Sequence, residues 1–314
     1  MSSPPPTKKH KASDLSGLEL ESSIAHLRNY RSSLIAEDVP ESESDSMAAV
    51  NELDGIIGTL ESRLNEPSSY NIEQKGMLKL KPWDELREAI ATSRDIGSGE
   101  LWSNDMMYKH LLFLFGSFKD KNETPSRTLI DTFFFRAGAM IPPPHKLVMM
   151  LENTVPASVP RESNMDTIYY TAIVAEKQLA KYYIQFPPLL NEASGGQMVA
   201  FFTVEAKSAS AGSLLDHIPQ AVVELIACAK RLGKSHIRGA LTTGIKWHFV
   251  AVDLNADKDG AKYWASEVIQ FIPPPANGSL PETDTSLIAA VLSEWIQHSF
   301  EEFKEDQWFI PIFL

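Results

Sequence analysis

The segment Met198-Val-Ala-Phe-Phe-Thr-Val-Glu-Ala-Lys207 decides how the second half of this chain folds. Residues 198–204 are almost all apolar and rich in β-forming types, which predicts a buried strand. The strand ends on Glu205 and Lys207, and because side chains alternate across a strand, both project to the same side. A carboxylate and an ammonium group at one sheet edge suit a hydrolase, which uses them to hold a hard cation and to stabilise developing negative charge.

The segments after this strand predict an α/β (α+β) domain with a mixed sheet. Residues 214–231 form an amphipathic pattern typical of a helix, with Gln220 and Glu224 one turn apart away from its apolar face. Residues 236–242 and 246–254 are β-rich and are joined through Gly244, which predicts a hairpin. A closing helix is expected over residues 286–304, followed by an apolar tail over 308–314.

The segments before this strand are expected to be mostly helical. Residues 67–81 are interpreted as a connection, and helices are predicted over 83–91, 106–118 and 127–140. Ser163 or Asn164 caps a further predicted helix that runs to Tyr182, with Glu162 at its entrance. Residues 183–186 are expected to form a short strand, and the prolines at 142–144 mark a domain boundary.

The chain is therefore divided into four parts: a disordered basic tail (1–13), a helical hairpin (14–66), a helical region (67–144) and a functional domain (145–314). In the second arm of the hairpin, apolar residues repeat at the spacing of a coiled-coil seam. They are Val50, Leu53, Ile57, Leu60 and Leu64. Such a hairpin serves as a spacer or a dimerisation device, or as a surface for a protein partner.

Composition limits the possible functions. The formal net charge is −12 over 314 residues, which argues against a general basic coat for nucleic acid. Cys228 is the single cysteine, so an internal disulfide and a cysteine-based metal site are excluded. The sequence contains no apolar run of membrane-spanning length and no signal peptide, which indicates an intracellular protein without a membrane association. Lys8, Lys9 and Lys11 resemble a nuclear-import signal, so the expected location is the nucleus or the cytoplasm.

Other enzyme signatures are missing from the sequence. There is no phosphate-binding or dinucleotide-binding glycine motif, and no Gly-x-Ser-x-Gly motif of a serine hydrolase. Glu205 and Lys207 therefore remain the leading candidates for chemistry.

The ordered combination of a strand ending in Val204-Glu205-Ala206-Lys207, a helix carrying Gln220 and a strand–turn–strand over Arg238–Phe249 resembles the PD-(D/E)xK nuclease-like superfamily. In particular it is similar to the large fungal set related to Crinkler-type and transposon-associated proteins. The resemblance covers about residues 160–255 and implies a restriction-endonuclease-like core with a mixed central sheet flanked by helices.

The resemblance also implies a chemistry, namely hydrolysis of phosphodiester bonds in nucleic acid with Mg²⁺, for which Mn²⁺ can substitute. Glu205 would bind the metal, Lys207 would position or activate the attacking water, and Gln220 would contact the phosphate or support the metal ligands. Glu162 would be the additional helix carboxylate. The aspartate that the family places before the Glu-x-Lys strand is replaced by Asn191, with Glu192 and Asp166 as the nearby carboxylates.

Two functions remain open at this point. The first is a Mg²⁺-dependent nuclease, and the second is a non-catalytic protein that keeps the nuclease-like fold as a module for binding protein or nucleic acid. Asn191 is neutral and binds a hard cation more weakly than aspartate, which favours the second. Glu205 and Lys207 would then form an ordinary ion pair, and Gln220 would be a solvated helix residue. A nucleic-acid cleft would be lined by cationic side chains, namely Lys207, Lys230, Arg231, Lys234 and Arg238.

Overall fold

The computed structural model describes residues 71–117, 123–154, 167–185, 199–207, 213–256, 260–273, 280–304 and 306–314, together with helical residues at 24, 26–28, 30–32, 50 and 53–60. The chain divides into two compact units. One consists of residues 1–69 and 156–165, and the other of residues 70–155 and 166–314. The candidate chemistry lies in the second unit.

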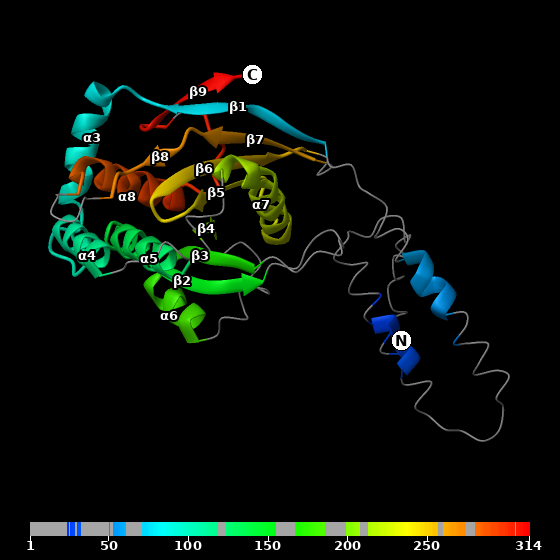
Figure 1. Cartoon of the computed structure of the whole chain (residues 1–314). Coiled ribbons are helices and arrows are strands. Elements are labelled where there is room, and N and C mark those ends of the chain that lie inside the picture. The colour runs from blue at the N-terminus through cyan, green and yellow to red at the C-terminus, as the bar shows by residue number, and fades with distance from the viewer. Residues whose placement is uncertain are drawn as a thin grey trace, which may run out of the picture. The chain divides into compact units, whose positions relative to one another are not determined.

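A mixed sheet organises the second unit. Within the described residues its strands are β1 (Ile72–Leu80), β2 (His145–Thr154), β3 (Thr167–Glu176), β4 (Ala200–Ala206), β5 (His236–Thr242), β6 (Lys246–Leu254), β7 (Ala261–Ser266), β8 (Ile269–Gln270) and β9 (Phe309–Phe313). Their spatial order is β2-β3-β4-β5-β6-β7-β1-β9, with β8 paired to β6. Figure 1 shows this order from β9 and β1 at the top to β2 at the bottom.

The middle of the sheet matches the sequence-based prediction. β4 is antiparallel to β3 and parallel to β5, and β5 and β6 form the expected antiparallel hairpin. Gly244 in the connecting turn has a φ of 82°, which requires the left-handed region that glycine adopts readily. The prediction of a mixed sheet flanked by helices is therefore confirmed.

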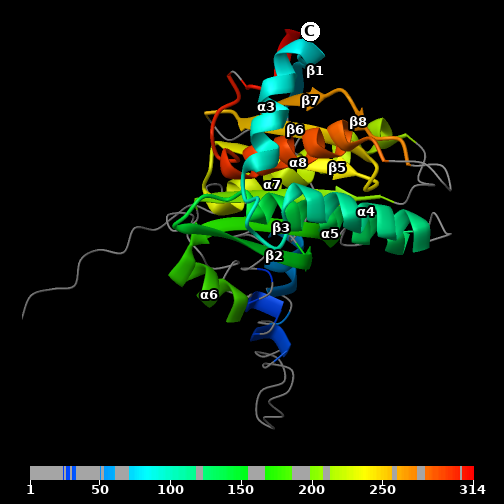
Figure 2. The same ribbon diagram turned by 90° about the vertical axis from the view of Figure 1, so that its left-hand side faces the viewer.

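Helices cover both faces of the sheet. One face packs against α8 (Glu282–Gln297), which is joined to α3 (Trp83–Asp95), α4 (Asn104–Ser117) and α5 (Glu123–Ala139) in one hydrophobic core. The other face packs against α7 (Ile218–Leu232), which follows the short 3-10 helix η3 (Leu214–His217), and against α6 (Lys177–Gln185). Figure 2 shows α3, α4, α5 and α8 together on the side that faces the viewer.

Two sequence-based expectations for residues 163–186 are wrong. Over the described residues 167–182 the predicted helix is instead β3 followed by α6, and residues 183–185 of the predicted strand belong to α6. Residues 167–176, Thr-Ile-Tyr-Tyr-Thr-Ala-Ile-Val-Ala-Glu, are mostly β-branched or aromatic, and the strand is buried on both faces, as Ala172, Ile173 and Val174 show. In a strand buried on both faces, apolar and polar residues do not alternate. Some apolar residues then fall three or four positions apart by coincidence, which is the spacing that predicts a helix.

The segment expected to be a connection over residues 67–81 contains β1. This strand pairs in parallel with β7 and antiparallel with β9, so its neighbours come from distant parts of the sequence. β9 itself lies within the expected apolar tail, and Pro311 pairs with Leu78 there. The backbone N–H of Leu314 donates to the carbonyl oxygen of Lys75 on β1, so Pro311, three residues earlier, points its nitrogen away from β1. That nitrogen lies on the open edge of the sheet. Because proline has no N–H, it discourages pairing with a further strand there.

The end of α3 is held by Arg136 of α5, whose side chain is almost fully buried. Its guanidinium donates to the carbonyl oxygens of Ser93 at 2.8 Å, Ile96 at 2.8 Å and Trp102 at 3.2 Å. Gly97 adopts a φ of 65° at this turn, and a Cβ there would lie 2.2 Å from the carbonyl oxygen of Ala139. The backbone groups at the end of the helix are thus satisfied by one side chain from a neighbouring helix.

The first unit is described at its helical residues alone. Arg31 and Asp54 form an ion pair with 2.6 Å between Nε and Oδ1, and Ile24 and Ile57 are buried. This agrees with a helical segment in each arm of the expected hairpin, and the coiled-coil hairpin remains a prediction. Within the described residues, no helix is long and apolar enough to cross a membrane.

Candidate functional site

Glu205 and Lys207 meet at the end of β4. Phe202, Val204 and Ala206 point into the core beneath α8, so the alternate residues face α7. Glu205 is 4 % exposed and the side chain of Lys207 is 17 % exposed, and their Oε1 and Nζ atoms lie 2.8 Å apart. The prediction that both head groups project to the same side is confirmed.

The helix α7 supplies the next contacts. Lys207 Nζ donates to Gln220 Oε1 at 3.3 Å, and Gln220 Nε2 donates to Glu224 Oε1 at 2.9 Å. Gln220 and Glu224 are four residues apart and therefore lie on the same side of the helix. A continuous polar chain thus runs from Glu205 through Lys207 and Gln220 to Glu224. Glu224 was not among the candidates from sequence, although its helical spacing from Gln220 is the signal that could have identified it.

Two backbone features place these groups. The backbone N–H of Lys207 donates to the carbonyl oxygen of Thr242 at 2.8 Å, which continues the β4–β5 pairing one residue beyond the strand. On β5, a Cβ at Gly239 would lie 2.8 Å from Leu225 Cδ2 and 2.8 Å from the carbonyl oxygen of Thr203. The missing side chain at Gly239 therefore allows α7 to lie close to the sheet.

The other predicted metal ligands, Glu162 and Asn191, lie outside the described residues. The helix that Glu162 was expected to precede does not form over residues 167–176, because these residues are β3. β3 is antiparallel to β4, with Tyr170 paired to Val204, so the start of β3 lies at the sheet end that bears Glu205. Asp166 directly precedes β3 in the sequence.

Within the described part of the chain, no group of three or more His, Cys, Asp or Glu side chains is placed to hold a metal ion. Glu205 is engaged by Lys207, and Gln220 lies between Lys207 and Glu224. These donors fit a hard divalent cation only if further oxygen ligands join Glu205, since Mg²⁺ requires an octahedral set of oxygens.

The expected cationic cleft does not include Arg238. This residue pairs with Phe202 and faces α8, where its guanidinium lies 5.2 Å from the ring of Trp295 and 5.4 Å from that of Phe303. Burial is the main cause that lowers the pKa of Arg238. Lys207 and Arg238 therefore occupy opposite faces of the sheet.

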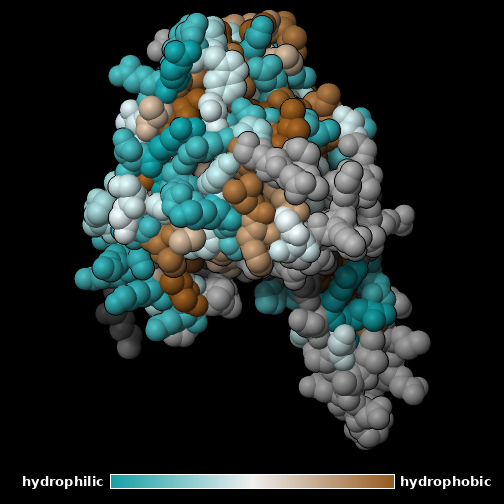
Figure 3. Space-filling model, turned by 60° about the vertical axis from the view of Figure 1, so that its left-hand side comes forward, coloured by the Kyte–Doolittle hydropathy of each residue, from teal (hydrophilic) through white to brown (hydrophobic). Residues whose placement is uncertain are grey.

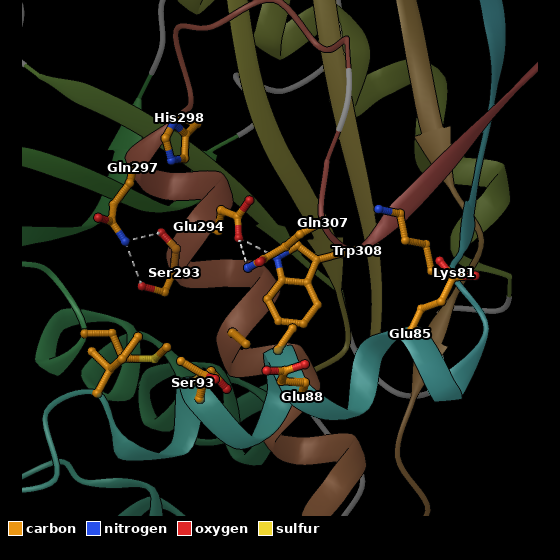
Figure 4. A pocket seen from close by; sticks show the side chains of 15 residues that line it. Lys81, Glu85, Glu88, Ser93, Ser293, Glu294, Gln297, His298, Gln307 and Trp308 are labelled. Atoms are coloured by element: carbon orange, nitrogen blue, oxygen red, sulfur yellow. Dashed lines mark hydrogen bonds between the residues drawn. The ribbon is translucent and has the colours of Figure 1, made fainter.

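A separate hollow of about 580 Å³ lies between α3, α8 and the segment before β9. Glu294 lines this hollow, and its Oε2 accepts from Trp308 Nε1 at 2.7 Å and from Gln307 Nε2. Burial and the nearby Asp306 raise the pKa of Glu294. Figure 4 shows Gln307 and Trp308 converging on Glu294, with Glu88 on the neighbouring α3. The four side chains of the polar chain, Glu205, Lys207, Gln220 and Glu224, are not among the residues that line this hollow.

The surface presents a mixed character. Figure 3 shows apolar side chains in separate groups among polar ones on the face that it displays. No protein-family model and no curated protein matches this chain.

Proposed function

We propose that the chain is a metal-dependent nuclease that hydrolyses phosphodiester bonds, with its site at the end of β4. The observation that supports this proposal is the 2.8 Å pair of Glu205 and Lys207 on the face of the sheet covered by α7. A carboxylate and an ammonium group in this arrangement can hold a cation and stabilise an anionic transition state. The geometry also agrees with the order of elements on which the resemblance rests, since β4 is followed by the Gln220 helix and the β5–β6 hairpin.

In this proposal the fold is a restriction-endonuclease-like core and each polar side chain has a role. Glu205 binds Mg²⁺ or Mn²⁺, and Lys207 orients the attacking water or stabilises charge on the phosphate. Gln220 holds the ammonium group of Lys207. The bound cation would polarise the phosphoryl oxygen and lower the pKa of a bound water. Glu162, Asn191 and Asp166 are the proposed sources of the remaining oxygen ligands.

A non-catalytic role as a binding module is the second candidate. It is favoured by the direct engagement of Glu205 by Lys207, since an ion pair of this kind is also a common structural feature of strand ends. The neutral side chain of Asn191 favours the same candidate, because aspartate would bind a divalent cation more strongly. Under this alternative the N-terminal helical region would bind a protein partner.

Cleavage by the purified full chain tests the proposal. Plasmid DNA, single-stranded DNA and single-stranded RNA are incubated with the protein, with Mg²⁺, with Mn²⁺ and with a chelator. We expect Glu205→Ala to abolish metal-dependent cleavage and Lys207→Met to reduce it by about 100-fold or more, as for other groups that stabilise transition-state charge.

Glu73→Ala is the matched control, because Glu73 pairs with Lys262 at 3.2 Å on the same sheet but on the strands β1 and β7. Circular dichroism confirms that each variant is folded. Cleavage by Glu205→Ala at the wild-type rate would refute the proposal, and folded wild-type protein without metal-dependent cleavage of any of the three substrates would favour the binding module.

A further inference from the structure

We infer that Glu224 is a positioning residue that fixes the amide orientation of Gln220, so that Gln220 presents its oxygen to the ammonium group of Lys207. The inference deepens the proposed function and rests on it for its catalytic consequence, because it names how the ammonium group of that site is held. Its geometric part depends only on the hydrogen bonds that join Lys207, Gln220 and Glu224.

The Gln220 amide has two chemically different ends. One end is an acceptor oxygen and the other is an NH₂ donor, and rotation by a half turn exchanges them. Lys207 can only donate and an ionised Glu224 can only accept. With Oε1 toward Lys207 at 3.3 Å and Nε2 toward Glu224 Oε1 at 2.9 Å, both contacts join a donor to an acceptor. The reversed amide would place a donor against the ammonium and an acceptor against the carboxylate.

The helix makes this arrangement specific. Gln220 and Glu224 lie one turn apart on α7, and both are half-buried, so the amide is held between its two partners rather than by bulk water. The backbone of Lys207 is also fixed, through its N–H bond to Thr242. Without Glu224, Lys207 would be the one partner among these contacts that distinguishes the two amide orientations.

The consequence concerns the state in which Glu205 binds a cation. A cation bound at Glu205 would compete with Lys207 for the same carboxylate, because both are positively charged. Gln220 Oε1 would then be the second acceptor that keeps Lys207 beside the site. Glu224 therefore acts on the reaction through Gln220 and Lys207 and not by touching the substrate.

Solvent exchange of the Lys207 ammonium protons, measured by NMR on the full chain, reports this hold directly. The signal is assigned by its absence from Lys207→Met. An amide without its orienting partner would still turn its oxygen toward Lys207 at least half of the time, so we expect Glu224→Met to accelerate exchange by up to about twofold. Glu224→Gln can donate as well as accept, so it no longer selects one orientation of the Gln220 amide and is expected to accelerate exchange as Glu224→Met does. Val223→Met, at an exposed neighbouring position on α7, is the control for helix substitution.

A second background separates positioning from a structural effect. A glutamate at position 220 has two equivalent oxygens, so Gln220→Glu needs no orienting partner. In that background we expect Glu224→Met to leave exchange slow. An unchanged rate in Glu224→Met alone, or an equal acceleration in both backgrounds, would overturn the inference. If Glu224→Met does not fold, Glu224→Asp withdraws the carboxylate by one methylene and is expected to accelerate exchange in the same direction, with an unchanged rate refuting the role.

Plasmid cleavage with Mg²⁺, measured on the same variants, separates this inference from the proposed function. We expect cleavage to fall with both Glu224→Met and Glu224→Gln and to stay at the wild-type rate with Val223→Met. Absence of cleavage in the wild type would refute the nuclease and leave the exchange measurement to decide the role of Glu224. Normal cleavage in Glu224→Met, despite accelerated exchange, would refute its catalytic consequence.

Discussion

Acid should destabilise this protein through His248. The residue lies on β6, is 2 % exposed, and neither ring nitrogen has a hydrogen-bond partner among the described residues. Burial lowers the pKa of His248 from its ordinary value of 6.5 to about 4. The backbone of Glu267 is close enough to offset part of this shift, although its geometry falls short of a hydrogen bond.

The sign and the size of the effect follow from linkage. The pKa of His248 is lower in the folded state, so the unfolded state binds the proton more readily and stability is lost as the pH falls. The stabilising contribution is fully present above about pH 7 and is lost progressively down to about pH 4. Integrating between pH 7 and pH 5 with pKa values of 6.5 and about 4 gives a loss of about 2 kcal/mol in the free energy of unfolding.

Urea unfolding at pH 7 and pH 5 tests this prediction. Leucine at position 248 cannot titrate and leaves no unsatisfied ring nitrogen, so His248→Leu should lose about 2 kcal/mol less than the wild type over this interval. Leu241→Met, at the paired position on β5, alters packing without altering titration and should keep the wild-type difference between the two pH values. The same pH-dependent loss in His248→Leu as in the wild type would refute the reasoning.

Two further predictions concern the end of α3. Arg136→Met leaves buried carbonyl oxygens without their donor and should lower the free energy of unfolding by about 3 kcal/mol. Arg87→Ala removes an exposed ion pair and should change this free energy little. Thermal unfolding of both variants measures the difference, and equal stabilities would contradict the prediction. Gly97→Ala should cost about 2 kcal/mol, because its φ is positive and its Cβ would meet the Ala139 carbonyl, whereas a Cβ at Gly99 has nothing within 4 Å. A melting temperature of Gly97→Ala equal to that of Gly99→Ala would show that the turn adapts.

The predictable elements are those that local chemistry specifies. β5 and β6 could be bounded from sequence because two β-rich segments are separated by Gly244, whose positive φ closes the turn. β1 could not, because its sequence contains several charged residues and glycine, and its pairing with β7 and β9 depends on segments far away in the chain. β3 was missed because burial on both faces removes the alternation that identifies most strands.

The candidate site also contains some features that the sequence predicts and others that it does not. Side-chain alternation was enough to predict that Glu205 and Lys207 share a face, since both belong to one strand end. The contact of Lys207 with Gln220 could not be predicted in this way, because it depends on the distance between α7 and the sheet. That distance depends in turn on the close packing of Gly239 with Leu225. The position of Arg238 on the opposite face could have been anticipated once its pairing with Phe202 was known, but sequence alone does not supply the register.

The place of β1 between β7 and β9 has a consequence for synthesis of the protein. This strand leaves the ribosome long before either of its neighbours, both of which come from the C-terminal part of the chain. A nascent chain that ends before Ala261 holds β1 with neither edge covered, and cellular chaperones would meet it in that state. Completion of the sheet therefore waits until β9 has been translated.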